Sequence, residues 1–281
     1  MNNLSLPTPT VSIEWLVNHL NHPNLVILDA TKTKVGQKEL SEEAKTKRIP
    51  RARIFDLQNT FKDQKDTLPN TMPSPDYFEK EIRKMGINND SIIVIYDHHG
   101  VYSSPRAWWI FKAMGHKNVA VLDGGFPAWK NANLPISIQT NYDGEAGNFE
   151  ANYQPNLIKS AAEVLATLEK KEVTILDARS DGRFHGTAPE PRAHLKSGHI
   201  PGSQNLPSSK IIKDGKLRSK TELKKIYDAF DLDNKEVIFS CGSGMTACVI
   251  ALGAEIAGHH SKAIFDGSWT EWGDGDYPVE K

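Results

Sequence analysis

The feature of this sequence that most constrains its fold is an internal duplication. Four strings from the first half return in the second half in the same order. The matching pairs are residues 24–30 with 173–179, 48–52 with 199–203, 93–97 with 237–241, and 122–129 with 265–272. Solenoid repeats have a period of about 20–50 residues, so a repeat this long is a duplication of whole domains. The sequence therefore predicts two copies of one fold.

Helical and strand patterns alternate along each half. In the first half, helical patterns cover residues 11–20, 75–85 and 103–114, and apolar strands cover residues 25–29, 92–96 and 119–122. In the second half, helical patterns cover residues 160–169, 221–230 and 245–257, and strands cover residues 173–176, 236–240 and 263–265. This alternation predicts an α/β fold in which each half forms a mainly parallel sheet flanked by helices.

The domain boundaries follow from length and composition. A chain of 281 residues is long enough for two domains that each have their own core. Residues 133–156 are polar, contain several Gly, Asn and Pro residues and show no clear periodicity, so we interpret them as a linker. The predicted domains are therefore residues 1–132 and residues 157–281.

The second half carries the segment with the most distinctive chemistry. A short apolar strand ends at Cys241, Gly242 and Gly244 follow, and an apolar helical pattern then runs to about Gly258. The glycines let the loop curl with its amides pointing inward, and the helix N-terminus adds partial positive charge. These dipoles favour a thiolate and predict a nucleophile at Cys241. The alternative for this residue type is a buried structural cysteine.

The first half lacks this cysteine. Asp97 occupies the matching position and is followed by two histidines, so the first half is predicted to be a non-catalytic copy. The second cysteine, Cys248, lies seven residues after Cys241 inside an apolar helical pattern. That position is typical of a small core residue, and the spacing matches no common metal-ligand pattern.

Composition excludes several classes of function. The formal net charge is −1 and the basic residues are scattered, so neither nucleic acid nor an anionic membrane is an expected partner. No apolar run is long enough to span a membrane, and the first residues do not resemble a targeting segment. Two cysteines exclude a disulfide framework and suit a reducing compartment, so we expect a cytoplasmic protein. No glycine string has nucleotide-binding spacing, and we expect neither a cofactor nor a metal.

These motifs in combination resemble a known family. The two α/β repeats, the His-Ile-Pro-Gly turn at 199–202, the Asp-Gly-Ser-Trp-Thr-Glu-Trp string at 266–272 and the Cys-Gly-Ser-Gly-x-Thr-Ala loop are similar to the tandem-domain rhodanese sulfurtransferases. The resemblance implies a rhodanese fold in both halves and a catalytic second half. It also implies that Cys241 accepts a sulfane sulfur as a persulfide. The sulfur would pass to cyanide or to a thiol, such as thioredoxin or a low-molecular-weight thiol.

The resemblance also indicates the site and the sulfur donor. The implied catalytic loop consists of Cys241, Gly242, Ser243, Gly244, Met245 and Thr246. Family members that prefer thiosulfate, a dianion, usually carry Arg and Lys directly after the cysteine, where this chain has a neutral pair. This favours the subtype that takes sulfur from 3-mercaptopyruvate and releases pyruvate. The alternatives are a thiosulfate sulfurtransferase and a persulfide carrier module without donor turnover of its own.

Two arginines match the family's substrate-binding positions. Arg183 lies in a Gly-Arg-Phe string and Arg192 in a Glu-Pro-Arg string. The resemblance implies that they bind the donor carboxylate and ketone, because a guanidinium grips a carboxylate through two hydrogen bonds. The alternative for either arginine is a salt bridge between the domains.

The sequence departs from the family at two positions. Met245 stands where the family commonly has Val, and an adaptable methionine is expected to have little effect there. Many members also have a proposed Asp–His–Ser relay, for which Asp56 matches the Asp and Asn70 stands in place of the His. Asparagine cannot transfer protons. Either Ser243 and Thr246 act as hydrogen-bond donors without a relay, or another histidine substitutes.

A cysteine-dependent phosphatase is an alternative interpretation of the cysteine loop, because such an enzyme also uses a thiolate in an anion-binding loop. Its Cys-x5-Arg pattern needs an arginine at position 247, and this chain has Ala247. Without that guanidinium the charge of a transition-state phosphate is uncompensated, so the sequence argues against a phosphatase.

Overall fold

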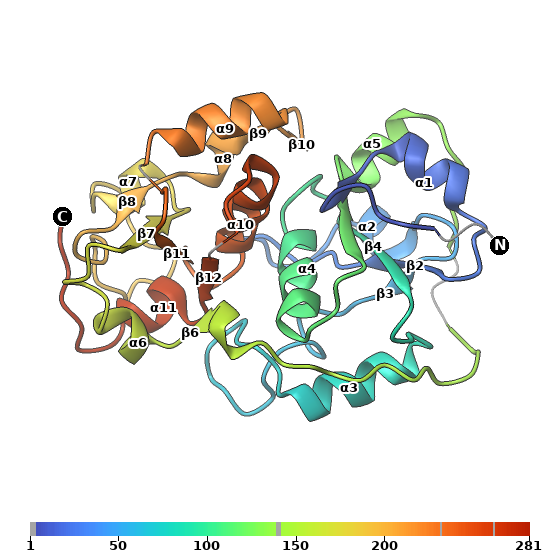
Figure 1. The fold of residues 1–281 in the computed structure, drawn as a ribbon, viewed down its shortest axis with the longest axis horizontal. Coiled ribbons are helices and arrows are strands. Elements are labelled where there is room, and N and C mark those ends of the chain that lie inside the picture. The colour runs from blue at the N-terminus through green and yellow to red at the C-terminus, as the bar shows by residue number, and fades with distance from the viewer. Residues whose placement is uncertain (1–3, 139–141, 231, 261) are drawn as a thin grey trace. The chain divides into compact units, whose positions relative to one another are not determined.

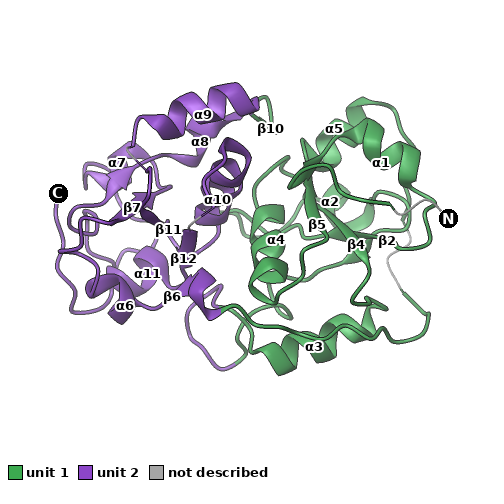
Figure 2. Cartoon of the chain, viewed as in Figure 1, with its two compact units in different colours: residues 1–64, 72–154, 214–217 green, residues 65–71, 155–213, 218–281 purple. Residues whose placement is uncertain are grey.

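The computed structural model describes residues 4–138, 142–230, 232–260 and 262–281. The chain divides into two compact units (Figure 2). Unit 1 comprises residues 1–64, 72–154 and 214–217, and unit 2 comprises residues 65–71, 155–213 and 218–281. Each unit therefore includes one short segment from the other half of the sequence.

Unit 1 is an α/β unit, and the colours of Figure 1 follow its elements along the chain. They are β1 (Thr10–Val11), α1 (Ile13–His19), β2 (Leu25–Asp29), α2 (Glu42–Thr46), β3 (Arg53–Ile54), α3 (Pro75–Lys84), β4 (Ile92–Tyr96), α4 (Ser104–Ala113), β5 (Val119–Leu122) and α5 (Gly125–Asn131). The segment 214–217 adds β10 (Lys216–Leu217).

Unit 2 has the same alternation of strands and helices, with a 3-10 turn before its first strand and, among the described residues, one further helix and strand. Its elements are the 3-10 turn η1 (Pro155–Leu157), β6 (Ile158–Lys159), α6 (Ala161–Leu165), β7 (Val173–Asp177), α7 (Asp181–Phe184), β8 (Gln204–Asn205), α8 (Ser208–Ile211), β9 (Ile212–Lys213), α9 (Lys220–Asp228), β11 (Glu236–Ser240), α10 (Thr246–Ala257), β12 (Lys262–Phe265) and α11 (Ser268–Trp272).

The two main sheets have the same topology. The strand order is β1-β5-β4-β2-β3 in unit 1 and β6-β12-β11-β7-β8 in unit 2, and all described pairs within these sheets are parallel. The register also repeats, since Asp29 pairs with Tyr96 and Asp177 pairs with Ser240. The predicted fold class, two α/β units with parallel sheets flanked by helices, is confirmed.

The complete burial of the central strands explains why they could be predicted from the sequence. Strands β2, β4 and β5 are buried along their whole length, because a parallel sheet is covered on both faces. Apart from Asp29 at the end of β2, their residues are accordingly apolar, and every predicted strand is present in the structure. The edge strands β1, β3, β6 and β8 have only two residues each, too few to show a period, and the sequence did not predict them.

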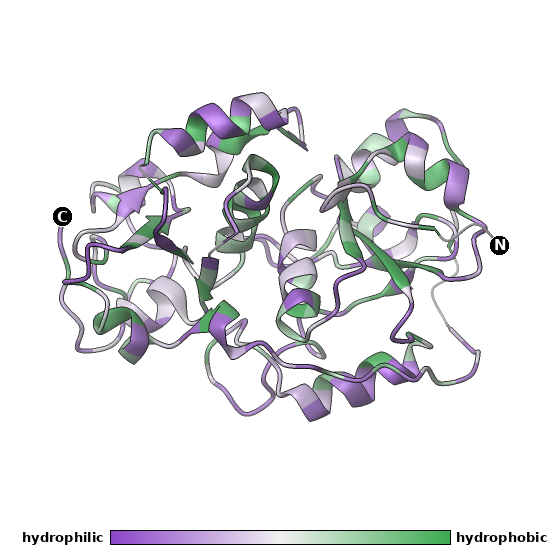
Figure 3. Cartoon of the chain, in the orientation of Figure 1, coloured by the Kyte–Doolittle hydropathy of each residue, from purple (hydrophilic) through white to green (hydrophobic). Residues whose placement is uncertain are grey.

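Helix starts differ in a way that bears on function. Five helices begin after a serine whose side chain accepts a hydrogen bond from a backbone amide of the first turn. These are α1, α2, α3, α6 and α9. Helix α10 follows Met245 and has no side-chain cap. This helix is buried on nearly all sides, and Figure 3 shows it as largely hydrophobic. Its packing, rather than a cap, therefore holds α10 in place and leaves its first amides exposed to the loop.

Within the described residues, no helix is long and apolar enough to cross a membrane.

Candidate active site

Cys241 directly follows β11, the middle strand of the unit 2 sheet. Ligands of open parallel sheets bind beyond the carboxyl ends of the strands, which is where this residue lies. The side chain is buried, with 1% of its surface exposed. The loop from Cys241 to Met245 then leads into α10, so the strand–loop–helix arrangement predicted for this segment is present.

The loop after Cys241 presents unpaired amides. Among the described residues, no hydrogen bond accepts from the backbone amides of residues 242, 243, 245, 246 and 247. Gly244 has a φ of 74°, a left-handed conformation that favours glycine and lets the loop turn tightly. A tight loop of amides at an uncapped helix N-terminus favours an anion. The geometry suits a thiolate or an anionic sulfur at this position.

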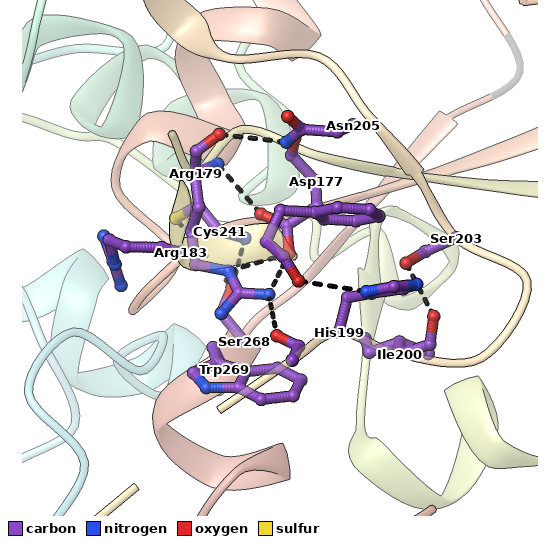
Figure 4. Close-up of polar contacts among 12 residues, drawn as sticks. Asp177, Arg179, Arg183, His199, Ile200, Ser203, Asn205, Cys241, Ser268 and Trp269 are labelled. Atoms are coloured by element: carbon purple, nitrogen blue, oxygen red, sulfur yellow. Dashed lines mark hydrogen bonds and ion pairs between the residues drawn. The ribbon is translucent and has the colours of Figure 1, made fainter. Parts of the chain in front are cut away.

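Ser268 holds the base of this loop. Its Oγ accepts hydrogen bonds from the amides of Cys241 (3.2 Å) and Gly244 (3.0 Å) and donates to the carbonyl of Phe265 (2.8 Å). Ser268 Oγ also lies 4.0 Å from Cys241 Sγ. Figure 4 shows Cys241 and Ser268 in this group of contacts. The start of α11 therefore fixes the curvature of the cysteine loop.

Arg183 lies against the loop at Gly242. Its Nη2 is 3.0 Å from the position that a Cβ on Gly242 would occupy. The same guanidinium is paired with Glu190: Nη2 donates to Oε2 at 2.6 Å, and Nε lies 3.2 Å from both carboxylate oxygens. The Arg183 side chain keeps 22% of its surface exposed. Arg183 therefore faces both the cysteine loop and a buried carboxylate.

The glutamate that pairs with Arg183 belongs to a buried ionic network. Arg179 is fully buried and lies with its guanidinium carbon 4.1 Å from the ring centroid of Trp269. It pairs with Asp177 at 2.7 Å and with Glu190 at 3.0 Å (Figure 4 draws Asp177 and Arg179). Because every charge in this network has a partner, its burial costs less than that of isolated charges. The network fixes Glu190, and Glu190 orients Arg183.

Arg192 reaches the same loop residue through Thr270. Arg192 Nη1 donates to Thr270 Oγ1 at 3.3 Å, and Thr270 Oγ1 donates to the carbonyl of Gly242 at 2.6 Å. The structure thus brings both predicted substrate arginines to the backbone of Gly242.

The protonation of one carboxyl group in α11, that of Glu271, depends on its surroundings. Glu271 follows Thr270 and is partly buried. Burial raises the pKa of this carboxyl above its usual value, and the nearby carboxylates of Asp266 and Asp66 raise it further. Glu271 is therefore easier to protonate than an exposed glutamate.

Ser243 is held by Asn70, which belongs to the segment 65–71 of unit 2. Asn70 Nδ2 donates to the carbonyl of Ser243 at 2.7 Å and to its Oγ at 2.9 Å. Only the amide nitrogen can donate to a carbonyl, so the orientation of the Asn70 side chain is determined. Since Ser243 Oγ accepts from Asn70, its own proton can be donated elsewhere. Asn70 thus orients the Ser243 hydroxyl as a donor without transferring a proton.

Replacing Asn70 with alanine is expected to lower kcat/KM for sulfur transfer by about thirtyfold, since two hydrogen bonds of about 1 kcal/mol each are lost and each 1.4 kcal/mol is a factor of about ten. Asn70→Asp should lower it further, because a carboxylate cannot donate to the Ser243 carbonyl. Steady-state kinetics would measure both, with exposed Asn21→Ala as the control. An unchanged rate in Asn70→Ala would show that this contact does not matter for the reaction.

Asp56, the candidate relay aspartate, belongs to unit 1. Its Oδ1 accepts from the amides of Gln58 (2.8 Å) and Asn59 (3.0 Å), and its Oδ2 accepts from Asn59 Nδ2 (3.0 Å). These bonds make Asp56 the cap of the turn after β3. Its role in a relay stays a prediction.

The matching loop of unit 1 already contains an anion of its own. Asp97 follows β4 as Cys241 follows β11. Asp97 Oδ2 accepts from the amides of Tyr102, Ser103 and Ser104 and from the Ser104 hydroxyl, at 2.7–3.0 Å. The buried carboxylate fills the amide loop that leads into α4. This loop therefore has no room for an external anion at those amides.

Cys248 differs from Cys241 in its contacts. It is fully buried within α10, and its Sγ lies 3.3 Å from the Gly244 carbonyl. Among the described residues, no group of three His, Cys, Asp or Glu side chains could hold a metal ion.

Sequence reasoning missed several residues that support the site. Ser268 and Thr270 lie in the repeated string 266–272, and Glu190 lies in the Glu-Pro-Arg string, but no role was predicted for them. Arg179 follows Asp177 in another repeated string. Their positions in repeated or family motifs indicated that these residues could matter for the site. The contacts that give them a role become visible only in the fold.

Comparison with known proteins places the chain in a family. The model of the rhodanese-like domain matches residues 12–132 and 160–274. The chain is 37% identical to 3-mercaptopyruvate sulfurtransferase of Mus musculus and 36% identical to thiosulfate sulfurtransferase of Bos taurus, in each case over 93% of this chain and 91% of the relative. A crystal structure of a 3-mercaptopyruvate sulfotransferase from Escherichia coli aligns with a TM-score of 0.83 and 31% identity, covering 94% of this chain and all of that one.

The family match occurs twice, once in each half, as the internal duplication requires. The relatives match nearly the whole chain rather than one domain. The chain belongs to the rhodanese family and is a sulfurtransferase enzyme with two rhodanese-like domains.

Proposed function

We propose that this enzyme transfers sulfur from 3-mercaptopyruvate through a persulfide on Cys241, with unit 2 as the catalytic unit. One observation carries the proposal. Cys241 lies at the start of an amide loop on whose second residue, Gly242, two arginines converge. A thiolate beside two guanidinium groups suits a donor that has both a sulfur and a carboxylate.

In the first step, the Cys241 thiolate attacks the sulfur of 3-mercaptopyruvate and forms an S–S bond. The C–S bond of the donor breaks, and its electron pair stays on the carbon as the enolate of pyruvate. The enolate takes up the proton that the donor sulfur carried and leaves as pyruvate, so the outer sulfur of the persulfide remains as an anion. The ketone beside the breaking bond makes this leaving group stable, and a guanidinium at the ketone oxygen lowers the barrier further.

The two arginines bind different parts of the donor, one the carboxylate and the other the ketone. A bidentate contact holds the carboxylate, and the second guanidinium polarises the ketone. The hydroxyl proton of Ser243, which Asn70 leaves free to donate, adds a neutral hydrogen bond. The loop amides stabilise the anionic sulfur of the persulfide.

In the second step, an acceptor attacks the outer sulfur of the persulfide and the Cys241 thiolate is released. A thiolate acceptor leaves as a new persulfide, and cyanide leaves as thiocyanate. Thioredoxin or a low-molecular-weight thiol fits this role, since both supply a thiolate.

The cysteines also bear on where the enzyme acts. Cys241 and Cys248 are both free thiols, which supports the proposal that the protein works in a reducing compartment such as the cytoplasm.

We expect a much higher kcat/KM with 3-mercaptopyruvate than with thiosulfate. The two residues after Cys241 are neutral, so a dianion lacks counter-charges beside the sulfur. Steady-state kinetics with both donors, following pyruvate and thiocyanate, tests this. Mass spectrometry of donor-treated enzyme should find one extra sulfur on Cys241. A higher efficiency with thiosulfate would overturn the donor assignment, and an enzyme that never carries extra sulfur would overturn the persulfide route.

Adding charge to the loop should shift the preference. The double variant Gly242→Arg with Ser243→Lys places two cations beside the sulfur and should favour thiosulfate. A side chain at position 242 must displace Arg183 Nη2, so 3-mercaptopyruvate turnover should fall at the same time. Ser243→Lys alone is the matched control, because it adds a charge without disturbing Arg183.

A further inference from the structure

Glu190 is a buried carboxylate that turns toward Arg183 rather than toward solvent. Its side chain has 2% of its surface exposed. Oε2 accepts from Arg183 Nη2 at 2.6 Å, and Oε1 accepts from Arg179 Nη1 at 3.0 Å. The Nε and Nη2 edge of Arg183 is therefore occupied. Its Nη1 donates no hydrogen bond to a described residue and remains for a ligand.

The charges of this group balance. Arg179 and Arg183 carry two positive charges, and Asp177 and Glu190 carry two negative charges. Arg192 lies outside this network and forms no ion pair with any described residue, since its hydrogen bond goes to the neutral Thr270. The arginine pair at Gly242 therefore has one compensated and one uncompensated guanidinium. One uncompensated cation matches a donor with one negative charge.

We propose that Glu190 is a positioning residue that sets the donor preference by neutralising Arg183. This rests on the proposed function, because it concerns the donor of the same site. With Glu190 charged, Arg183 supplies directed N–H groups but little net charge, so a dianion gains little over a monoanion. Removing the carboxylate restores a second full positive charge at the loop. A dianionic donor then gains more than a monoanionic one.

Neutral and charged substitutions of Glu190 separate charge from shape. Glu190→Gln and Glu190→Met remove the charge at similar length, and Glu190→Asp keeps it. The ratio of kcat/KM for thiosulfate to kcat/KM for 3-mercaptopyruvate should rise about tenfold in both neutral variants. The ratio should stay near the wild-type value in Glu190→Asp, even where both rates fall. Exposed Glu172→Gln controls for a general loss of one negative charge.

A binding measurement makes the test independent of turnover. In a Cys241→Ser background, calorimetry compares sulfate, a dianion, with pyruvate, a monoanion. Glu190→Gln should raise the affinity for sulfate relative to that for pyruvate by a similar factor. If the wild type proved inactive with both donors, the proposed function would fail, and this affinity ratio would still decide the role of Glu190.

Three results would overturn the role of Glu190. The first is an unchanged donor ratio in a folded neutral variant. The second is an equal rise in Glu190→Asp, which would assign the effect to shape. The third is loss of cooperative thermal unfolding in both neutral variants, which would assign the carboxylate to stability, because a buried guanidinium without its partner is strongly destabilising.

Discussion

Replacing Cys241 with serine is expected to abolish sulfur transfer, with a loss of more than about a thousandfold for every donor. A serine hydroxyl at this position is far less acidic than a thiol and forms no persulfide. The loop itself should survive the change, because its fold depends on backbone amides bound to Ser268. The variant should therefore melt like the wild type while it releases no pyruvate.

Cys248→Ser is the matched control for this prediction. Cys248 is buried in α10 and contacts the Gly244 carbonyl, a bond that a serine hydroxyl can also make. Most of the activity should remain in this variant. Mass spectrometry of the donor-treated wild type locates the transferred sulfur. Extra mass on the peptide containing Cys248, with none on Cys241, would contradict the assignment.

Arg183→Ala and Arg192→Ala are each expected to reduce kcat/KM for 3-mercaptopyruvate by tens to hundreds of fold. The loss of a charge-assisted contact to the donor costs about 2–4 kcal/mol, and each 1.4 kcal/mol is a factor of about ten. Persulfide formation from inorganic polysulfide should suffer less, because that donor has no carboxylate. Arg183→Lys should recover only part of the activity, since lysine keeps the charge but cannot pair with both oxygens of Glu190 while it also contacts the donor.

Arg218→Ala provides the control for these arginine variants. Arg218 also pairs with a glutamate of unit 2, Glu222, but it precedes α9 and takes no part in the cysteine loop. Its removal should leave donor kinetics unchanged. Equal losses with 3-mercaptopyruvate and polysulfide in Arg183→Ala and Arg192→Ala would disprove a carboxylate-binding role. Thermal melting shows whether each variant is folded.

The sequence by itself determined the architecture. Parallel strands that are covered on both faces are mostly apolar, so β2, β4, β7 and β11 were recognisable as short apolar runs bounded by turns. The duplication then implied that both halves share one strand order. The cysteine loop was also readable, because Cys241, Gly242 and Gly244 are neighbours in sequence. Each of these signals is local or repeated, which is why one sequence contains it.

The tertiary structure alone decided how the loop is supported. Asn70 reaches Ser243 across 173 residues of sequence, and Arg192 reaches Thr270 across 78. The sequence suggested only that Asn70 could not relay a proton, whereas the structure shows that it orients the Ser243 hydroxyl. The pairing of Arg183 with Glu190 depends on a buried network that also holds Arg179. Such contacts depend on the packing of distant segments, and neither periodicity nor motif spacing records which buried charges meet.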